Sequence, residues 1–138
     1  MLRGRLQRFL ERRRCRAEWR VGEPDDPIPL LLRLNLPPPA HGLMADIIWA
    51  HKRWQREALS RKVAIRVSRL EVSVLHPEDL ILMKLDAGGP QDLLDVEALL
   101  SNLLQELSLR RLKRKASQLG LERHLERCLN AGRKKRER

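Results

Sequence analysis

Apolar positions along the chain recur at two spacings, which predict both helices and strands. Between residues 2 and 17 the apolar side chains stand three and four positions apart, with arginines around them, and this predicts a helix. Short apolar or alternating stretches predict strands at residues 16–21, 28–36, 43–50, 63–67 and 70–74. The second and third of these are apolar enough for buried strands. The last two are separated by Ser68 and Arg69 and predict a hairpin.

The second half of the chain is typical of packed helices. A short amphipathic helix is expected over residues 51–60. Another begins at Pro77, with Pro at its first position, His76 before it and acids in its first turn. Gly88 and Gly89 end that helix, and Pro90 stands at the start of the next. Leucine spacing predicts two more helices, at residues 109–112 and 119–129. Together these elements indicate an α/β to α+β fold.

Lys84 is unusual within the helix that begins at Pro77, because it projects between Leu80 and Ile81 on an otherwise apolar face. Its ammonium either extends along the apolar surface to solvent or meets an anion or carboxylate at the rim. Asp92 and Asp95 stand three positions apart, on one side of the next helix's first turn. They are expected to complement the helix dipole and are candidates for pairing with Lys84.

Asp46 lies inside the apolar stretch 43–50. A lone carboxylate on a buried strand is unfavourable unless it is paired or binds a metal ion. Two interpretations therefore stay open: an edge position at which Asp46 faces solvent, or a metal site.

The net charge of +11 is concentrated at the two ends of the chain. Residues 1–20 carry +6 and residues 105–138 carry +8, whereas the middle carries −3. Basic ends indicate either solvated helix faces or contact with a nucleic acid. The candidate contact residues are Arg110, Arg111, Lys113, Arg114, Lys115, Arg133, Lys134, Lys135 and Arg136. With three Trp, one Phe and no Tyr, the chain offers no aromatic strand for stacking bases, which excludes a dedicated single-strand binder.

Cysteine spacing and the length of apolar runs indicate the compartment of the protein. Cys15 and Cys128 are far apart and have no CxxC spacing, so the sequence indicates neither a zinc site nor a disulfide framework. No apolar run reaches the roughly 20 residues of a membrane span, so we expect a cytoplasmic protein with no membrane contact. We expect one domain over residues 1–130, followed by a basic, disordered tail at 131–138.

The stretch HPEDLILMKLDAGGPQDLLDVEALL, residues 76–100, resembles the C-terminal signature of the minimal nucleotidyltransferase-like superfamily. In that signature a Pro-Glu-Asp-Leu sequence, a lysine and an Asp-x-x-Asp pair follow one another in this register. The resemblance extends over roughly residues 16–107 and implies a small mixed sheet with flanking helices. It also implies transfer of a nucleotidyl group from a nucleoside triphosphate, with Mg²⁺ or Mn²⁺ held by three carboxylates.

By position, the resemblance gives roles to four residues. Asp46 corresponds to the third metal-binding carboxylate and Lys84 to the lysine that meets phosphate. Asp92 and Asp95 correspond to the paired acids that shape the nucleotide site. Asp46 and Lys84 are thus implied catalytic residues.

The chain also departs from the superfamily pattern. It lacks the Gly-Ser or Gly-Gly turn and the Asp-x-Asp pair that precede the first helix, and Gly89 and Gln91 stand where the pattern has Arg and Lys. We therefore expect a domain truncated at its N-terminal side and inactive or incomplete as this chain, with a missing N-terminal segment, a dimer or a partner protein completing it. The alternative is a non-catalytic binding module, either a toxin–antitoxin component or a remnant that holds RNA or DNA.

Overall fold

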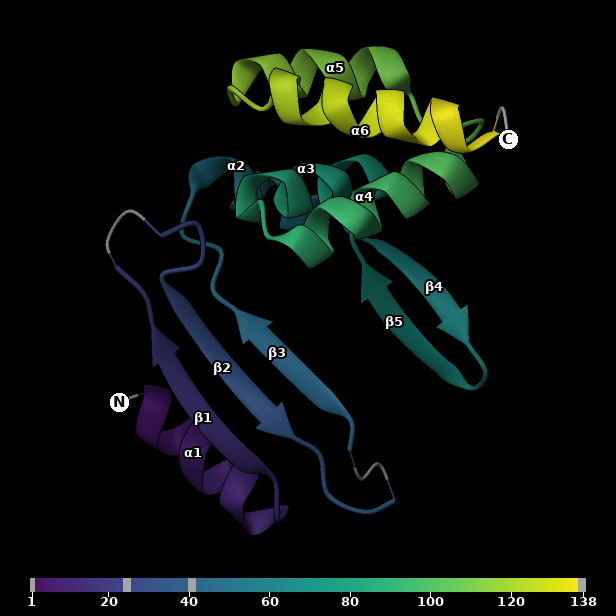
Figure 1. The fold of residues 1–138 in the computed structure, drawn as a ribbon. Helices are drawn as coiled ribbons and strands as arrows, with labels where there is room; N and C mark the ends of the chain where they lie inside the picture. Colours follow the sequence, from purple (N-terminus) through teal and green to yellow (C-terminus); the bar gives the residue numbers. More distant parts are fainter. Residues whose placement is uncertain (1, 24–25, 40–41, 137–138) are drawn as a thin grey trace. The chain divides into compact units, whose positions relative to one another are not determined.

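The computed structural model describes residues 2–23, 26–39 and 42–136, and it divides the chain into two compact units, Met1–Ala50 and His51–Arg138. Each unit is described by itself, so the expected single domain over residues 1–130 stays a prediction. Both units combine helices with antiparallel strands, and the fold is therefore α+β (Figure 1). The expected mixed sheet is wrong for the described strands, because every pairing between them is antiparallel.

The first unit is a helix followed by a three-stranded meander. It comprises α1 (Leu2–Arg12), β1 (Arg16–Val21), β2 (Leu30–Asn35) and β3 (Met44–Ile48), with strand order β1-β2-β3. Its buried core consists of Leu10, Cys15, Leu32 and Leu34. Helix α1 ends five residues earlier than expected. Arg14 takes a left-handed φ of 55°, and the N–H of Cys15 donates to the Leu10 carbonyl at 3.0 Å, which closes the helix end.

Strand β3 differs from its prediction as a buried strand. It forms an edge of the three-stranded sheet, and four of its five residues are exposed. An edge strand has a neighbour on one side only, so an apolar sequence alone does not bury it. This edge position decides the surroundings of Asp46.

The second unit packs α3 together with four other helices. It comprises α2 (Arg53–Ser60), β4 (Val63–Val67), β5 (Leu70–Val74), α3 (Pro77–Ala87), α4 (Pro90–Leu103), α5 (Leu109–Gln118) and α6 (Glu122–Arg136). Helix α3 contributes Ile81, Leu82 and Leu85, each at most 1% exposed, to a core completed by side chains from α4, α5 and α6. The predicted helix start at Pro77 is confirmed. Helix α6 continues to Arg136, through most of the segment 131–138 that is expected to be a disordered tail: a helix already anchored by buried Leu125 and Cys128 extends through the basic sequence.

Strands β4 and β5 form the predicted hairpin. The register pairs Val63 with Val74, Ile65 with Val72 and Val67 with Leu70, which places six aliphatic side chains on one face. Five of the six are exposed. Ser68 accepts a left-handed φ of 57° in the two-residue turn, where glycine or asparagine is the usual choice.

Candidate functional site

The candidate site is built on α3 and on the tight turn that follows it. His76 precedes α3, Pro77 occupies its first position, and Gly88 ends it with a left-handed φ of 67°. Gly89 then precedes α4, so that the end of α3 and the start of α4 lie side by side (Figure 1). Two consecutive glycines allow this reversal without a side chain in the turn. The reversal brings the side chains of α4's first turns to Lys84.

Lys84, Asp92 and Asp95 form one cluster, which we call the Lys84 cluster. The Lys84 ammonium donates to Asp95 Oδ2 at 2.6 Å and to Asp92 Oδ1 at 3.3 Å. The Gln91 amide donates to the other oxygen of Asp95 at 2.9 Å. Lys84 is 25% exposed, so its charge lies at the rim of the helical core. The predicted pairing of these residues at the rim is observed, which leaves their predicted role toward nucleotide open.

The electrostatics of the Lys84 cluster favour its charged form. Burial alone lowers the pKa of Lys84, but hydrogen bonds from its ammonium to Asp95 and Asp92 outweigh this and raise the pKa above its ordinary value. The hydrogen bond from Lys84 in turn lowers the pKa of Asp95. One ammonium and two carboxylates together carry a net charge of −1 at neutral pH.

Gly89 matters to the Lys84 cluster because it has no side chain. A Cβ added at this position would lie 3.0 Å from Asp92 Oδ2. Any residue with a side chain here would therefore displace the carboxylate or be displaced by it. Gly89 stands where the superfamily pattern has a larger residue, and in this chain it lets Asp92 lie against the backbone.

Asp46 lies in the other unit, on β3, and is paired across the sheet with Arg33 of β2. Arg33 donates from Nε and Nη2 to the two Asp46 oxygens at 2.9 and 2.7 Å. This hydrogen bonding lowers the pKa of Asp46 and raises that of Arg33. Of the two interpretations left open by the sequence, the observed position is the edge of a sheet, with an arginine as the partner.

Neither Asp46, the carboxylate predicted to hold Mg²⁺ or Mn²⁺, nor the paired acids predicted to shape the nucleotide site form a ready metal site. Both oxygens of Asp46 accept from Arg33, and Asp95 accepts from Lys84 and Gln91. Among the described residues, no group of three or more His, Cys, Asp or Glu side chains is placed to hold a metal ion. A metal ion would have to displace a cation from any of these carboxylates.

A second charged cluster on α3, which sequence reasoning missed, surrounds Asp79. The Asp79 side chain is 1% exposed and accepts from Arg61 Nε at 3.2 Å, Arg61 Nη2 at 2.9 Å and Lys115 Nζ at 2.7 Å. We call these three residues the Asp79 cluster. Burial raises the pKa of Asp79, yet hydrogen bonds from Arg61 and Lys115 bring it below its ordinary value. The cluster ties α2, α3 and α5 together.

Two other acids of α3 also bind neighbouring elements. Glu78 is buried and accepts from the backbone N–H of Ser108, at the start of α5, at 3.1 Å. Asp86 accepts from the Lys52 ammonium at 2.7 and 2.8 Å, just before α2. A sequence signal was available: Asp79, Leu82 and Asp86 share one stripe of the helix, and Leu82 marks that stripe as buried. Acids on a buried stripe need partners.

The residues predicted to contact nucleic acid differ in exposure. Arg110, Lys113 and Arg114 are exposed on α5, and Arg111 is half-buried. Lys115 points inward to Asp79 instead. The side chains of Arg133, Lys134, Lys135 and Arg136 lie outside the described residues, although their backbone belongs to α6.

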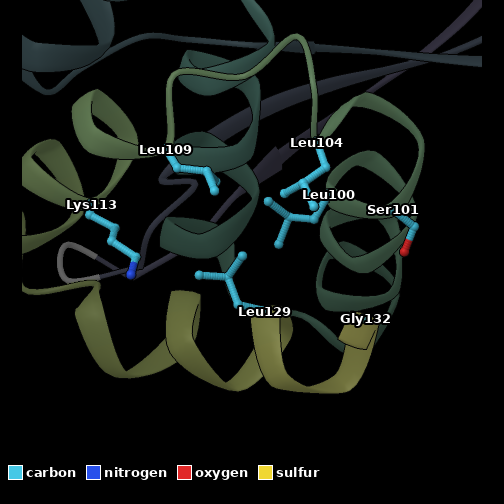
Figure 2. Close-up of a pocket in the computed structure, with 7 residues that line it drawn as sticks. All are labelled: Leu100, Ser101, Leu104, Leu109, Lys113, Leu129 and Gly132. Atoms are coloured by element: carbon cyan, nitrogen blue, oxygen red, sulfur yellow. The ribbon is translucent and has the colours of Figure 1, made fainter. Parts of the chain in front are cut away.

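A small aliphatic cavity of about 80 Å³ lies between α4, α5 and α6 (Figure 2). Leu100, Leu104, Leu109 and Leu129 point toward one another across it, with Ser101 and Lys113 at its margins. Such a lining suits an apolar group and offers few partners to a phosphate. We therefore place the candidate site at the charged clusters of α3.

Comparison with known proteins gives one match. A family model described as nucleotidyltransferase of unknown function (DUF6036) matches residues 48–127, more than half of the chain. The match includes the Lys84 and Asp79 clusters, and Asp46 lies just before it. No curated protein and no solved structure matches the chain. No helix in the described part of the chain is long and apolar enough to cross a bilayer.

Proposed function

Since the chain belongs to the family of nucleotidyltransferases of unknown function, we propose that it binds a nucleoside triphosphate at the Lys84 cluster, as the complex of that nucleotide with Mg²⁺ or Mn²⁺. The motif resemblance, now matched by the family, is the first support. The transfer of a nucleotidyl group is the reaction of the lineage. The proposal extends to catalysis of this transfer by the chain itself. Asp46 is then the candidate for the third metal-binding carboxylate of the superfamily.

The single observation that carries the proposal is the position of the Lys84 ammonium. It is charged, it is fixed by Asp95 at 2.6 Å, and it lies at the rim of the helical core. A fixed ammonium at a rim is a suitable donor to a phosphate oxygen, because its position needs no further ordering when a ligand arrives.

The net negative charge of the Lys84 cluster makes nucleotide binding depend on a divalent cation. Two carboxylates and one ammonium repel a free nucleoside triphosphate, which carries several negative charges. A divalent cation bound to the triphosphate offsets that repulsion and can approach the two carboxylates while phosphate approaches Lys84. Here Mg²⁺ arrives with the ligand. The carboxylates of the described residues do not form a metal site of their own.

Calorimetric titration tests the proposal. Purified chain is titrated with ATP, CTP, GTP and UTP, each with Mg²⁺, with Mn²⁺ and with a chelator alone. We expect saturable binding of at least one nucleotide, present only with the divalent cation and lost in Lys84→Ala. Lys52→Ala is the matched control, because Lys52, like Lys84, pairs with a carboxylate, that of Asp86, but lies outside the cluster.

The variant Asp46→Ala tests whether Asp46 takes part in binding the metal–nucleotide complex. Loss of metal-dependent binding in this variant would support Asp46 as a ligand of the metal–nucleotide complex. Unchanged binding would restrict the site to the second unit. Binding that is equally tight with chelator and with the divalent cation, and that is indifferent to Lys84→Ala, would overturn the proposal as a whole.

A second candidate function is contact with RNA or DNA through the exposed side of α5. Arg110, Lys113 and Arg114 are exposed and form no ion pair with another described residue. Neutralising one phosphate contact should lower the slope of log K against log salt by about 1. We expect this for Arg114→Gln and no change for Arg69→Gln, an exposed arginine of the hairpin turn. Equal slopes in both variants would reject α5 as the contact surface.

A further inference from the structure

A cavity of about 90 Å³ adjoins the Asp79 cluster, between α2, α3 and α5. Its polar lining comes from Arg61, Asp79, Lys115, Glu57 and Gln118, with Trp54 as an aromatic wall and leucines beneath. Lys84 does not line it. Residues 79 and 84 are five apart on one helix, and therefore about 140° apart around its axis, so this cavity and the Lys84 cluster lie on different sides of α3.

The buried carboxylate orients two cations toward this cavity. Asp79 holds Arg61 through Nε and Nη2, and it holds Lys115 through one N–H of its ammonium. The side chains of Arg61 and Lys115 are still 35% and 21% exposed. Arg61 Nη1 and the remaining N–H groups of Lys115 have no hydrogen-bond partner among the described residues. Donors of this kind, fixed in position and partly accessible, are what an oxyanion needs.

The charge of the Asp79 cluster has the sign that an anion requires. Two cations face one carboxylate in that cluster, which leaves a local excess of +1. The other acid in the lining, Glu57, accepts from the exposed Arg53 Nε at 2.9 Å and its charge also acts on Arg61, so the excess is confined to the donors around Asp79 and the lining as a whole is neutral. The Gln118 amide is exposed beside the cavity and adds an uncharged donor.

We propose that this cavity binds a small oxyanion of the phosphate class, with Arg61 Nη1 and Lys115 Nζ as its donors and Gln118 at its rim. A tetrahedral oxyanion occupies roughly the volume of two to three liquid waters of about 30 Å³ each, which suits a cavity of this size. The buried Asp79 is a positioning residue: it holds both cations and makes no contact with the ligand. The site is independent of nucleotide binding at Lys84 and needs no divalent cation.

Nuclear magnetic resonance provides the test. Inorganic phosphate is titrated into the full chain in the presence of a chelator, with ionic strength held constant by chloride. We expect saturable shifts of the Arg61 Nε–H and Trp54 indole N–H signals, and at least tenfold weaker binding in Arg61→Gln and Lys115→Gln. Lys113→Gln removes the same charge from the same helix outside the cavity and should bind as the wild type does.

Gln118→Glu keeps the test decisive if the other variants lose their fold. It leaves the Asp79 cluster intact and adds a negative charge at the rim, so phosphate binding should be abolished while the spectrum remains that of a folded chain. A parallel titration with a nucleoside monophosphate compares a phosphomonoester with free phosphate. The ligand that binds more tightly identifies the source of the oxyanion. Non-saturable shifts in the wild type, or equal weakening in Lys113→Gln, would overturn the proposal. Failure of metal-dependent nucleotide binding at Lys84 would leave these outcomes unchanged.

Discussion

The two charged clusters of α3 are opposites in composition and in burial. The Asp79 cluster has one carboxylate between two cations, and the Lys84 cluster has one cation between two carboxylates. Asp79 is 1% exposed and joins three helices, whereas Lys84 is 25% exposed and joins two. Similar hydrogen bonds on one helix therefore differ in role. The burial of the central charge decides whether a cluster stabilises the fold or stays accessible to a ligand.

The energetic reason lies in what remains when a partner is removed. A buried charge that loses its partners cannot recover hydration, so breaking a buried pair costs several kcal/mol, whereas an exposed pair contributes little. The Asp79 cluster should therefore hold the fold together. The Lys84 cluster can exchange a carboxylate for a ligand without a large change in stability.

The largest expected effect is that of Asp79→Asn. This variant keeps the shape of the side chain and removes the charge that holds Arg61 and Lys115. We expect a loss of about 3 kcal/mol in the free energy of unfolding, at the lower end for buried pairs because both cations can still reach solvent. Urea denaturation at neutral pH measures it.

Asp95→Asn is the matched control for that loss. It makes the same chemical change on the carboxylate that approaches Lys84 most closely, and it should lower stability far less. Equal losses in the two variants would remove the distinction between a structural and an exposed cluster.

A smaller effect is expected from pH. The pKa of Asp79 is lower in the folded chain than in the unfolded one, so the unfolded chain binds the additional proton in acid. The stability from this group is complete above the unfolded pKa, near 4, and is lost as the pH falls through the folded pKa. Unfolding measured across acid pH should show a shallower decline in Asp79→Asn than in the wild type. A parallel decline would assign acid sensitivity to other carboxylates.

The smallest effect on stability is expected at the turn between α3 and α4. Gly89→Ala places a methyl group 3.0 Å from Asp92 Oδ2, and a shift of the carboxylate away from that methyl group should disturb the hydrogen bond from Lys84 to Asp92 Oδ1. We expect a loss of about 0.5–1 kcal/mol in unfolding, as for alanine replacing glycine before a helix, together with about tenfold weaker binding of the metal–nucleotide complex. Wild-type affinity in this variant would show that Asp92 has no part in binding.

Much of the fold follows from local patterns. The strands 16–21, 63–67 and 70–74, the helix start at Pro77 and the glycine turn at Gly88 are observed at the predicted residues. These depend on periodicity and on backbone preferences, which neighbouring residues determine. Lys84 could also be paired with Asp92 and Asp95 in advance, because helical geometry places all three near one short turn.

Features that depend on distant partners were not predictable in this way. Asp79 was interpreted as an acid at a helix start, since nothing local reveals Arg61 or Lys115, which lie 18 and 36 positions away. The Arg33 partner of Asp46 depends on the register of β2 against β3 across a long connection. Helix α6 continues through a basic segment because its buried leucine and cysteine anchor it, which composition alone does not show.

We propose that the Lys84 cluster receives the nucleotide while the Asp79 cluster holds the helices. Calorimetric titration of one magnesium–nucleotide complex into Lys84→Gln and Arg61→Gln, side by side, tests it most directly. Both variants lose one cation from α3's surroundings and keep an amide in its place. We predict that binding disappears in Lys84→Gln and persists in folded Arg61→Gln. Binding that persists in Lys84→Gln and disappears in Arg61→Gln would contradict the account.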